Sequence, residues 1–382
     1  MIPARFMTFG EFMKMFAVTA TLTFGVLLTF FVMSNRHLTS KVESNRLTIG
    51  ALLCLTGDCA EWGNNSLMGM QLAADEINAG GGVLGHQIEI VAQDSKEASG
   101  GSNSVTAYRQ LMLNTSINFV VGPTWTAGGL PLAPIAAKNM DSIIISPSLG
   151  VSQFNETAPN IFNIWPHDSK ATTGLARFAH ARGYKRVAIL SGNDAWVTVQ
   201  GDTFEKEFKR LGGEITIKVQ VNPGTRDVRT EALKISRTTP DAVFYADTYN
   251  MASVARELKI LQYAGAQLSI LMDDTRLREA QGALERTFFA MYPEVSADFQ
   301  RRFQMRYAMA PGIAADTGYD AVKLYAAAIS KAKSFDARVV GPVLLDMKLE
   351  GASGEIKFDD FGGVERTPKF YQVNNGAYLK LE

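Results

Sequence analysis

Apolar and polar residues follow two alternating patterns along most of the chain. Residues 47–55 form a near-continuous apolar run, which is typical of a parallel strand covered on both faces. Residues 66–78 instead repeat apolar positions with the 3.6-residue period of a helix that buries one face. The same alternation predicts further strands at residues 88–92, 117–121, 142–145, 187–190, 214–221, 242–245 and 268–271, and further helices at residues 105–113, 129–138, 168–182, 201–211, 228–236 and 251–263.

These units form two successive series, each about the length of one doubly wound domain. They predict an α/β protein with two doubly wound, Rossmann-like lobes. A third stretch adds a strand near Phe288, helices at residues 298–307 and 319–332, and a β-rich tail from Gly354.

The N-terminal segment has a different character, because residues 15–33 are apolar and carry no charge. Such a stretch can cross the hydrocarbon core of a bilayer, and it is longer than the apolar part of most signal peptides. The polar residues 34–45 follow at once, which argues against a buried helix of the fold. We predict that residues 1–45 are a signal peptide or membrane anchor plus linker. The protein is then periplasmic or otherwise extracytoplasmic, with residues 15–33 either removed or kept as an inner-membrane anchor.

Composition excludes several classes of function. The chain has 382 residues, with 38 Lys and Arg balanced by 38 Asp and Glu, so no basic excess is available for nucleic acid. Hydrophobic residues make up 46%, which is ample for a folded core. The two Cys and four His have no ligand-like spacing, so we predict neither a metal site nor a cofactor.

Common catalytic motifs are missing or misplaced. Gly80, Gly82 and Gly85 match the spacing of a dinucleotide fingerprint, but they follow a predicted helix and precede a predicted strand. The fingerprint needs the reverse order, because the pyrophosphate sits on a helix N-terminus. The Gly-Lys pair of a phosphate loop and the G-x-S-x-G motif of a nucleophile elbow are both absent. We therefore predict a protein that is not an enzyme.

The two cysteines leave two readings open. Cys59 lies beside Asp58 and Glu61, whose carboxylates would raise the thiol pKa and disfavour a nucleophile. Cys54 and Cys59 could form a small disulfide in an exported protein, or remain two free buried thiols.

The tryptophans indicate where a ligand would bind. Trp62, Trp125 and Trp196 each follow a predicted strand closely, and Trp165 lies where the first series of units gives way to the second. Ligands of open α/β sheets bind outside the carboxyl ends of strands, so these positions favour a cleft with aromatic walls over ordinary packing between lobes. Polar candidates at other strand ends are Tyr249, Asp273, Asp274, Thr124, Thr126, Ser146 and Ser148.

A set of short motifs runs through the chain from the first predicted strand. They are Ile49-Gly50, Leu55-Thr56-Gly57, Trp62-Gly63, Gly69, Ala73-Ala74, Ile77-Asn78, the glycine turn at 80–85, Asp94, Gly122-Pro123, Ile145-Ser146-Pro147, Tyr319-Asp320-Ala321, residues 351–354, Ile356 and Phe358-Asp359. On these motifs, the chain from about residue 47 to its C-terminus resembles the periplasmic binding proteins for branched-chain amino acids.

The resemblance implies a type I periplasmic binding fold in which three crossover segments join the lobes. Residues 47–165 and 291–349 would form lobe 1, and residues 166–290 and 350–382 would form lobe 2. The implied function is capture of a small polar ligand (an amino acid, an amide or a related compound) by lobe closure, and delivery to the permease of an ABC importer. A membrane-anchored sensor of the same fold is the alternative.

The resemblance also implies roles for individual residues. It places Thr126 at the ligand carboxylate, and Ser148 and Gly150 at the head group, where many members have Thr instead of the glycine. It places Asp274 at a ligand ammonium group, although Asp273 or Asp274 could equally cap the following helix. The implied aromatic walls are Trp62, Trp196 and Tyr249, together with Trp125 at a position that is commonly small.

Overall fold

The computed structural model describes residues 45–97, 100–222, 225–292 and 295–381, together with Gly10. The chain divides into two units, Met1–Arg46 and Leu47–Glu382, and the fold below is that of the second. The apolar segment predicted at residues 15–33 lies outside the described residues. Within the described part, none of the helices is both long enough and apolar enough to cross a membrane.

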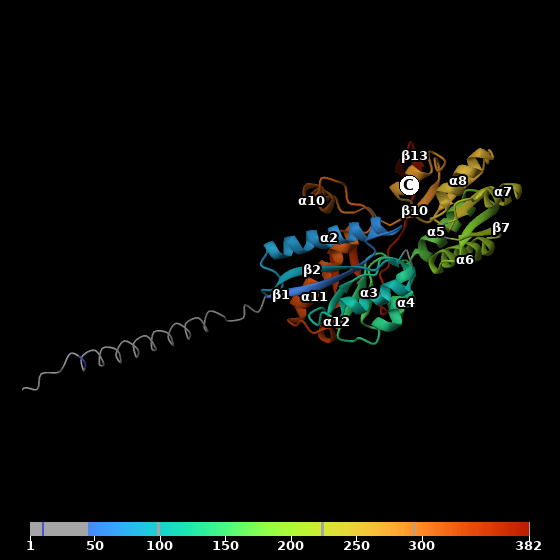
Figure 1. Cartoon of the computed structure of the whole chain (residues 1–382). Helices are drawn as coiled ribbons and strands as arrows, with labels where there is room; N and C mark the ends of the chain where they lie inside the picture. Colours follow the sequence, from blue (N-terminus) through green and yellow to red (C-terminus); the bar gives the residue numbers. More distant parts are fainter. Residues whose placement is uncertain (1–9, 11–44, 98–99, 223–224, 293–294, 382) are drawn as a thin grey trace, which may run out of the picture. The chain divides into compact units, whose positions relative to one another are not determined.

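The first lobe is built on a five-stranded sheet in the order β2-β1-β3-β4-β5 (Figure 1). Its strands are β1 Arg46–Leu53, β2 Gln87–Asp94, β3 Phe119–Val121, β4 Ile143–Ser146 and β5 Ile161–Asn163. The helices between them are α2 Ala60–Ala79, α3 Ser102–Leu111 and α4 Thr126–Ala136, with a short 3-10 turn, η2, at Asn155–Thr157. Both faces of β1 are covered, because Ile49 and Leu53 pack in one hydrophobic cluster and Leu52 in another. Burial on both faces explains the apolar run in the sequence.

The second lobe is built on a seven-stranded sheet in the order β14-β13-β10-β9-β8-β6-β7. Its strands are β6 Arg186–Gly192, β7 Glu214–Val221, β8 Ala242–Tyr245, β9 Ala266–Ser269, β10 Phe288–Met291, β13 Lys369–Asn374 and β14 Ala377–Lys380. Its helices are α5 Asp168–Ala181, α6 Ala195–Arg210, α7 Arg229–Arg237, α8 Met251–Ile260 and α9 Asp274–Glu279. The strands from β6 to β10 pair in parallel, whereas β13 and β14 are antiparallel additions at one edge.

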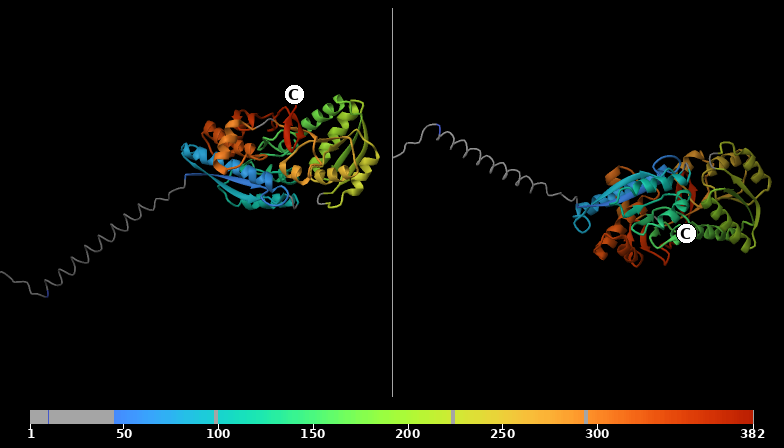
Figure 2. Two further views of the ribbon diagram at one scale, coloured as in Figure 1. Left: turned by 90° about the horizontal axis from the view of Figure 1, so that it is seen from above. Right: turned by 60° about the horizontal axis from the view of Figure 1, so that its bottom comes forward.

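The chain passes between the lobes three times, so each lobe combines segments that are distant in sequence (Figure 2). After β10 it returns to the first lobe as α10 Ala297–Tyr307, α11 Ala315–Ala332, α12 Ala337–Leu345 and the hairpin of β11 Lys348–Gly351 with β12 Gly354–Lys357. Ile356 and Phe358 pack in the core of the first lobe, although the sequence assigned residues 350–382 to the second. We therefore place the last crossover after Val364, which also packs in that core. The predicted α/β fold with two doubly wound lobes is otherwise confirmed.

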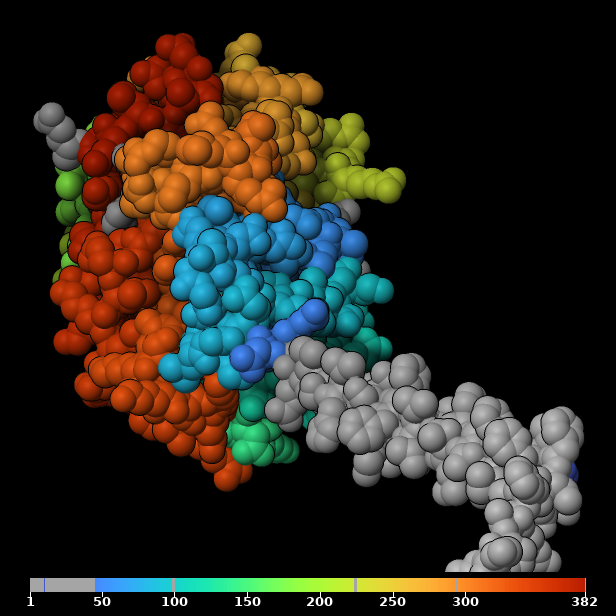
Figure 3. All heavy atoms as spheres, turned by 90° about the vertical axis from the view of Figure 1, so that its left-hand side faces the viewer, coloured from blue at the N-terminus to red at the C-terminus, as the bar shows by residue number. Residues whose placement is uncertain are grey.

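Helix α10 contacts α2 through ion pairs, and Figure 3 shows the orange residues around α10 against the blue α2. Arg302 pairs with Glu76, and Arg306 Nε lies 3.3 Å from Asp75 Oδ2. These contacts join the third stretch of the chain to the first helix of the lobe.

Helices α2 and α11 approach each other so closely that only glycine fits at two positions. A Cβ atom at Gly69 would lie 1.9 Å from the carbonyl oxygen of Ala315. A Cβ atom at Gly318 would lie 2.3 Å from the carbonyl oxygen of Ser66. The two backbones therefore touch directly at this crossing, and no side chain separates them.

Several helices begin at least three residues earlier than the apolar period predicts, and three of them have a tryptophan at or near their N-terminus. Helix α2 begins at Ala60 instead of residue 66, α4 at Thr126 instead of 129, and α6 at Ala195 instead of 201. The additional turns contain polar and small residues that interrupt the apolar period, such as Asn64 and Asn65 in α2 and Thr126 and Gly128 in α4. Tryptophans expected in loops therefore lie at helix N-termini.

Candidate ligand-binding site

A cavity of about 50 Å³ lies between the two lobes, at the carboxyl ends of strands from both sheets. Its lining from the first lobe is Trp62, Trp125, Thr126, Ala127, Ser148 and Gly150. Its lining from the second lobe is Asp168, Asp194, Trp196, Thr248, Tyr249, Leu271, Asp273 and Arg276. Seven of the eight residues to which the family resemblance gives a ligand-binding role thus surround one cavity, and Asp274 does not.

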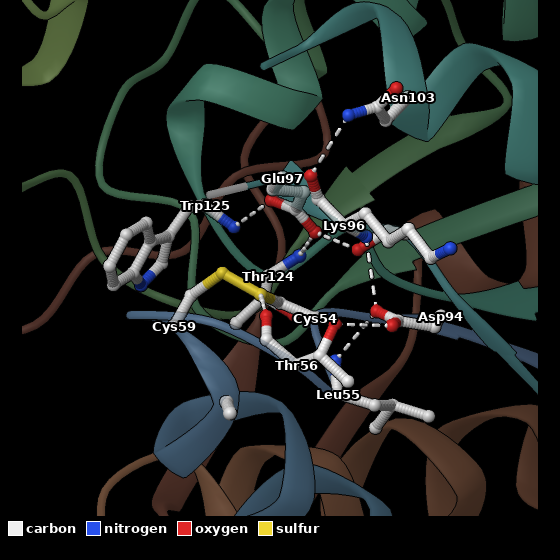
Figure 4. Close-up of a disulfide and its surroundings, with 12 residues drawn as sticks. Cys54, Leu55, Thr56, Cys59, Asp94, Lys96, Glu97, Asn103, Thr124 and Trp125 are labelled. Carbon is white, nitrogen blue, oxygen red and sulfur yellow. Dashed lines mark hydrogen bonds between the residues drawn. A yellow bond between two sulfur atoms is a disulfide. The ribbon is translucent and has the colours of Figure 1, made fainter. Parts of the chain in front are cut away.

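The first-lobe wall is organised around a buried carboxylate that the sequence analysis missed. Glu97 accepts hydrogen bonds from the backbone N–H groups of Thr124 at 2.9 Å and Trp125 at 2.6 Å (Figure 4). It also accepts one from the Ser95 hydroxyl at 2.6 Å. Burial raises the pKa of Glu97 to about 7, although these hydrogen bonds act to lower it. The carboxylate holds the turn that leads into α4, and this turn sets the position of Thr126.

A disulfide between Cys54 and Cys59 fixes the neighbouring part of this wall (Figure 4). The sequence left open whether these cysteines pair, and the structure joins them. Cys54 follows β1 and donates its backbone N–H to Thr124 Oγ1 at 2.9 Å, whereas Cys59 is the N-cap residue of α2. The bond therefore ties the end of β1 to the helix turn that carries Trp62.

Loss of this disulfide should destabilise the protein measurably. The cysteines are five residues apart, and closing so short a loop is worth about 2 kcal/mol by the chain-entropy relation. Urea unfolding with and without reductant should show a decrease of that size. The Cys54→Ala/Cys59→Ala variant is the control, because its free energy of unfolding should not respond to reductant. Equal responses of both proteins would contradict the assignment.

The second-lobe wall carries another buried carboxylate, Asp168, which is only 2% exposed. Its Oδ1 accepts the indole N–H of Trp165 at 3.0 Å, and its Oδ2 accepts the indole N–H of Trp196 at 2.7 Å. Burial raises the pKa of Asp168 to about 7, against the lowering effect of the two indoles. Asp168 is the first residue of α5, close to the junction that the sequence marked with Trp165, and this proximity was the available signal.

Gly150 of the first lobe and Asp168 of the second lobe are in close contact at the cavity. A Cβ atom at position 150 would lie 1.9 Å from Asp168 Oδ2 and 2.5 Å from Trp196 Nε1. The backbone N–H of Asp168 also donates to the Gly150 carbonyl at 3.0 Å. The space that a threonine side chain would take at position 150 is therefore filled by the Asp168 carboxylate.

The structure places Asp274, which the sequence assigned to a ligand ammonium group, outside this cavity. Asp274 Oδ1 accepts a hydrogen bond from the Tyr378 hydroxyl at 2.8 Å and lies on a second cavity instead. Its neighbour Asp273 lines the site, where it caps α9 by accepting the Arg276 N–H at 2.8 Å and pairs with Arg276 Nη1 at 2.7 Å. The helix-capping alternative thus holds for Asp273, and its charge is balanced by Arg276.

The buried carboxylate Asp168 gives a specific dependence of stability on pH. Between about pH 4 and pH 7 the unfolded carboxylate is ionised while the folded one keeps its proton, so its contribution to stability falls as pH rises through this range. We expect the free energy of unfolding of the Asp168→Asn variant to fall less steeply with pH than that of the wild-type protein, by up to about 1 kcal/mol per pH unit. Urea unfolding at several pH values measures both slopes. Parallel curves for the two proteins would contradict the raised pKa.

Comparison with known proteins gives the same picture of the fold. The periplasmic binding protein family model matches residues 46–377. The Leu/Ile/Val-binding protein BraC3 of Rhizobium johnstonii is 24% identical, over 88% of this chain and 94% of that protein.

Solved structures extend this likeness to the three-dimensional fold. The substrate-binding protein LivJ of Streptococcus pneumoniae, solved in complex with isoleucine, has a TM-score of 0.78 and 23% identity, over 88% of this chain and 99% of that chain. A solute-binding protein of an ABC transporter from R. palustris, solved in complex with benzoate, has a TM-score of 0.78 and 18% identity, over 88% of this chain and 95% of that chain. Because the family model covers most of the sequence, this chain belongs to the periplasmic binding protein family and has the type I fold of its branched-chain amino acid binding members.

Proposed function

We propose that this protein is an extracytoplasmic solute-binding protein that captures a small polar ligand between its lobes and delivers it to the permease of an ABC importer. The observation that carries the proposal is a cavity whose walls come from both lobes. A ligand that touches both walls stabilises the closed arrangement, and no bond need be made or broken. The lobes also contact each other directly, because the Thr275 hydroxyl donates to the Glu61 carboxylate at 2.6 Å.

The first-lobe side of the cavity suits a carboxylate or amide head group. Thr126 and Ala127 are the first two residues of α4, and the N–H groups of a first helical turn have no acceptor within the helix. The Thr126 hydroxyl lies on the same wall, whereas the Ser148 hydroxyl donates its proton to the Thr124 carbonyl at 2.7 Å. Backbone N–H groups at a helix N-terminus attract anions and carbonyl oxygens. Isoleucine and benzoate, the ligands of the two solved relatives, both carry a carboxylate.

The cavity is small, and its size limits the ligand. At about 50 Å³ it holds about four water-sized groups, whereas typical drug-sized pockets are several times larger. Trp62, Trp125 and Trp196 all line this space. We expect a compact ligand with few atoms beyond its head group.

Mass spectrometry of compounds released from the denatured protein tests the proposal, together with a thermal-melting panel. The panel contains amino acids, amides, urea derivatives and aromatic acids. A ligand at a hundred times its dissociation constant stabilises the folded state by about 2.7 kcal/mol, which gives a visible shift. Absence of both a co-purified compound and any shift would contradict ligand capture.

The sensor alternative rests on the uncharged segment at residues 15–33, which would hold the protein at the membrane if it is not cleaved. A binding protein of an importer and a sensor should differ in the genes that lie next to their own. Adjacent genes for a permease and ATPases favour delivery to an importer.

A further inference from the structure

We propose that the cavity between the lobes accepts an N-alkylated ammonium group, with Asp168 as its counter-ion and the surrounding tryptophans as its walls. This inference rests on the proposed function, because it names the chemical class of ligand for the same cavity. It is carried by three observations: the balance of charge around the cavity, the aromatic walls, and the hydrogen bonds that Asp168 already makes.

Burial raises the pKa of Asp168 to about 7, so above that pH the charged side chains around the cavity leave an excess of negative charge. Among the described residues, four charged side chains line it: Asp168, Asp194, Asp273 and Arg276. Arg276 is paired with Asp273 and also donates to the Thr248 carbonyl at 3.2 Å, so its charge is balanced within the wall. Asp168 and Asp194 have no cationic partner among the lining residues. A positive charge on the ligand would complete this site.

Aromatic rings cover the cavity from several directions. Trp62 and Trp196 are each only 8% exposed, and Trp125 packs edge-on against Tyr249 with ring centroids 5.3 Å apart. The ring planes of Trp62 and Trp165 make an angle of 48°, with ring centroids 5.7 Å apart, so these two rings are not stacked in parallel. Indole rings are the best partners for cations held over their faces, and rings of different orientation can surround a cation.

The hydrogen bonds of Asp168 determine which kind of cation fits. Each carboxylate oxygen already accepts one indole N–H, from Trp165 and from Trp196. A primary ammonium brings three N–H donors, and the indole rings offer no conventional acceptor for them, so its donors depend on the hydroxyls of Thr126 and Ser148 and on Asp194. An alkylated ammonium presents methyl or methylene groups instead, and these pack against the rings without unpaired donors. Its nitrogen and attached carbons also match a cavity that holds about four water-sized groups.

The decisive experiment compares a cation with its neutral isostere on the full-length protein. Choline and 3,3-dimethylbutan-1-ol have the same shape and differ in the charge of one atom. Titration followed by tryptophan fluorescence should show that choline binds at least about tenfold more tightly than the alcohol. Leucine and benzoate complete the panel as a primary ammonium compound and an anion.

Variants then assign the preference to Asp168. Asp168→Asn should remove the difference between choline and the alcohol, whereas Trp62→Ala should weaken both ligands. Asp202→Asn is the matched control, because it removes one carboxylate from an exposed position on α6 that does not line the cavity, and it should leave the difference intact.

Equal binding of choline and the alcohol to the wild-type protein would overturn the inference whether or not the variants fold. So would binding of leucine or benzoate without choline, but that result would leave the proposed capture function standing. If no member of the panel binds, the ammonium assignment is also overturned, and the capture function is then judged by the co-purified compound alone.

Discussion

Gly150→Ala is expected to lower the affinity for the ligand of the cavity about 100-fold, because the new methyl group meets two groups that cannot easily move. The added Cβ would lie 1.9 Å from Asp168 Oδ2 and 2.5 Å from Trp196 Nε1, both of which belong to the opposite lobe. To accommodate it, the lobes must separate or the carboxylate must leave its two indole partners. Either adjustment disfavours the closed form that holds the ligand.

Titration with the panel compound that stabilises the wild-type protein most would measure this loss. Gly201→Ala in α6 is the control, because its Cβ would approach only the Ser191 hydroxyl and the flexible Lys218 side chain. Its affinity should stay within a few-fold of wild type. If the Gly150→Ala variant binds the compound as tightly as the wild-type protein does, Asp168 moves aside freely. The close contact between Gly150 and Asp168 would then be wrong.

Sequence patterns located most of the fold and most of the cavity wall for one physical reason. Parallel strands buried on both faces are apolar runs, and their carboxyl ends collect at one edge of a sheet. Trp62, Trp125 and Trp196 follow such runs, so they could be assigned to a common cleft without knowledge of the packing. The structure places all three on one cavity.

Asp168 was not predicted to line the cleft, because the strand before it was not predicted. Strand β5 is only three residues long, Ile161–Asn163, and too short to produce a recognisable apolar run. Without that strand, the segment with Trp165 and Asp168 was not recognised as another strand end. This cavity-lining residue was therefore missed together with the strand that positions it.

The sequence favoured Asp274 over Asp273 as a residue of the cleft, whereas Asp273 is the one that lines the cavity, and the reason for this difference is another one. Both residues follow β9, and adjacent positions at the start of a helix point in different directions. Asp273 is the N-cap residue of α9 and faces the cavity, whereas Asp274 is the first helical residue and reaches Tyr378. A shift of one residue in the start of a helix decides which carboxylate lines the site, and sequence patterns do not fix helix starts so finely.

Gly69→Ala is expected to destabilise the first lobe by about 3 kcal/mol or more, at the upper end for an overpacked core. The clash is with a backbone atom, the carbonyl oxygen of Ala315 at 1.9 Å, and a backbone cannot rotate away as a side chain can. Helices α2 and α11 would have to separate, which would disturb the cluster of buried residues that contains Met70 and Tyr325. Urea unfolding of the purified variant measures the loss.

The Gly201→Ala variant separates this clash from the general effect of replacing glycine in a helix. Both positions are helical, and alanine alone favours a helix by about 0.5–1 kcal/mol over glycine. At Gly201 the nearest atom to the new Cβ is a rotatable hydroxyl at 3.1 Å, so the change in stability should stay within about 1 kcal/mol of zero. The two variants should therefore differ by several kcal/mol. Equal stabilities would mean that α2 and α11 do not touch backbone to backbone, and the close crossing that sets the position of Trp62 would have to be abandoned.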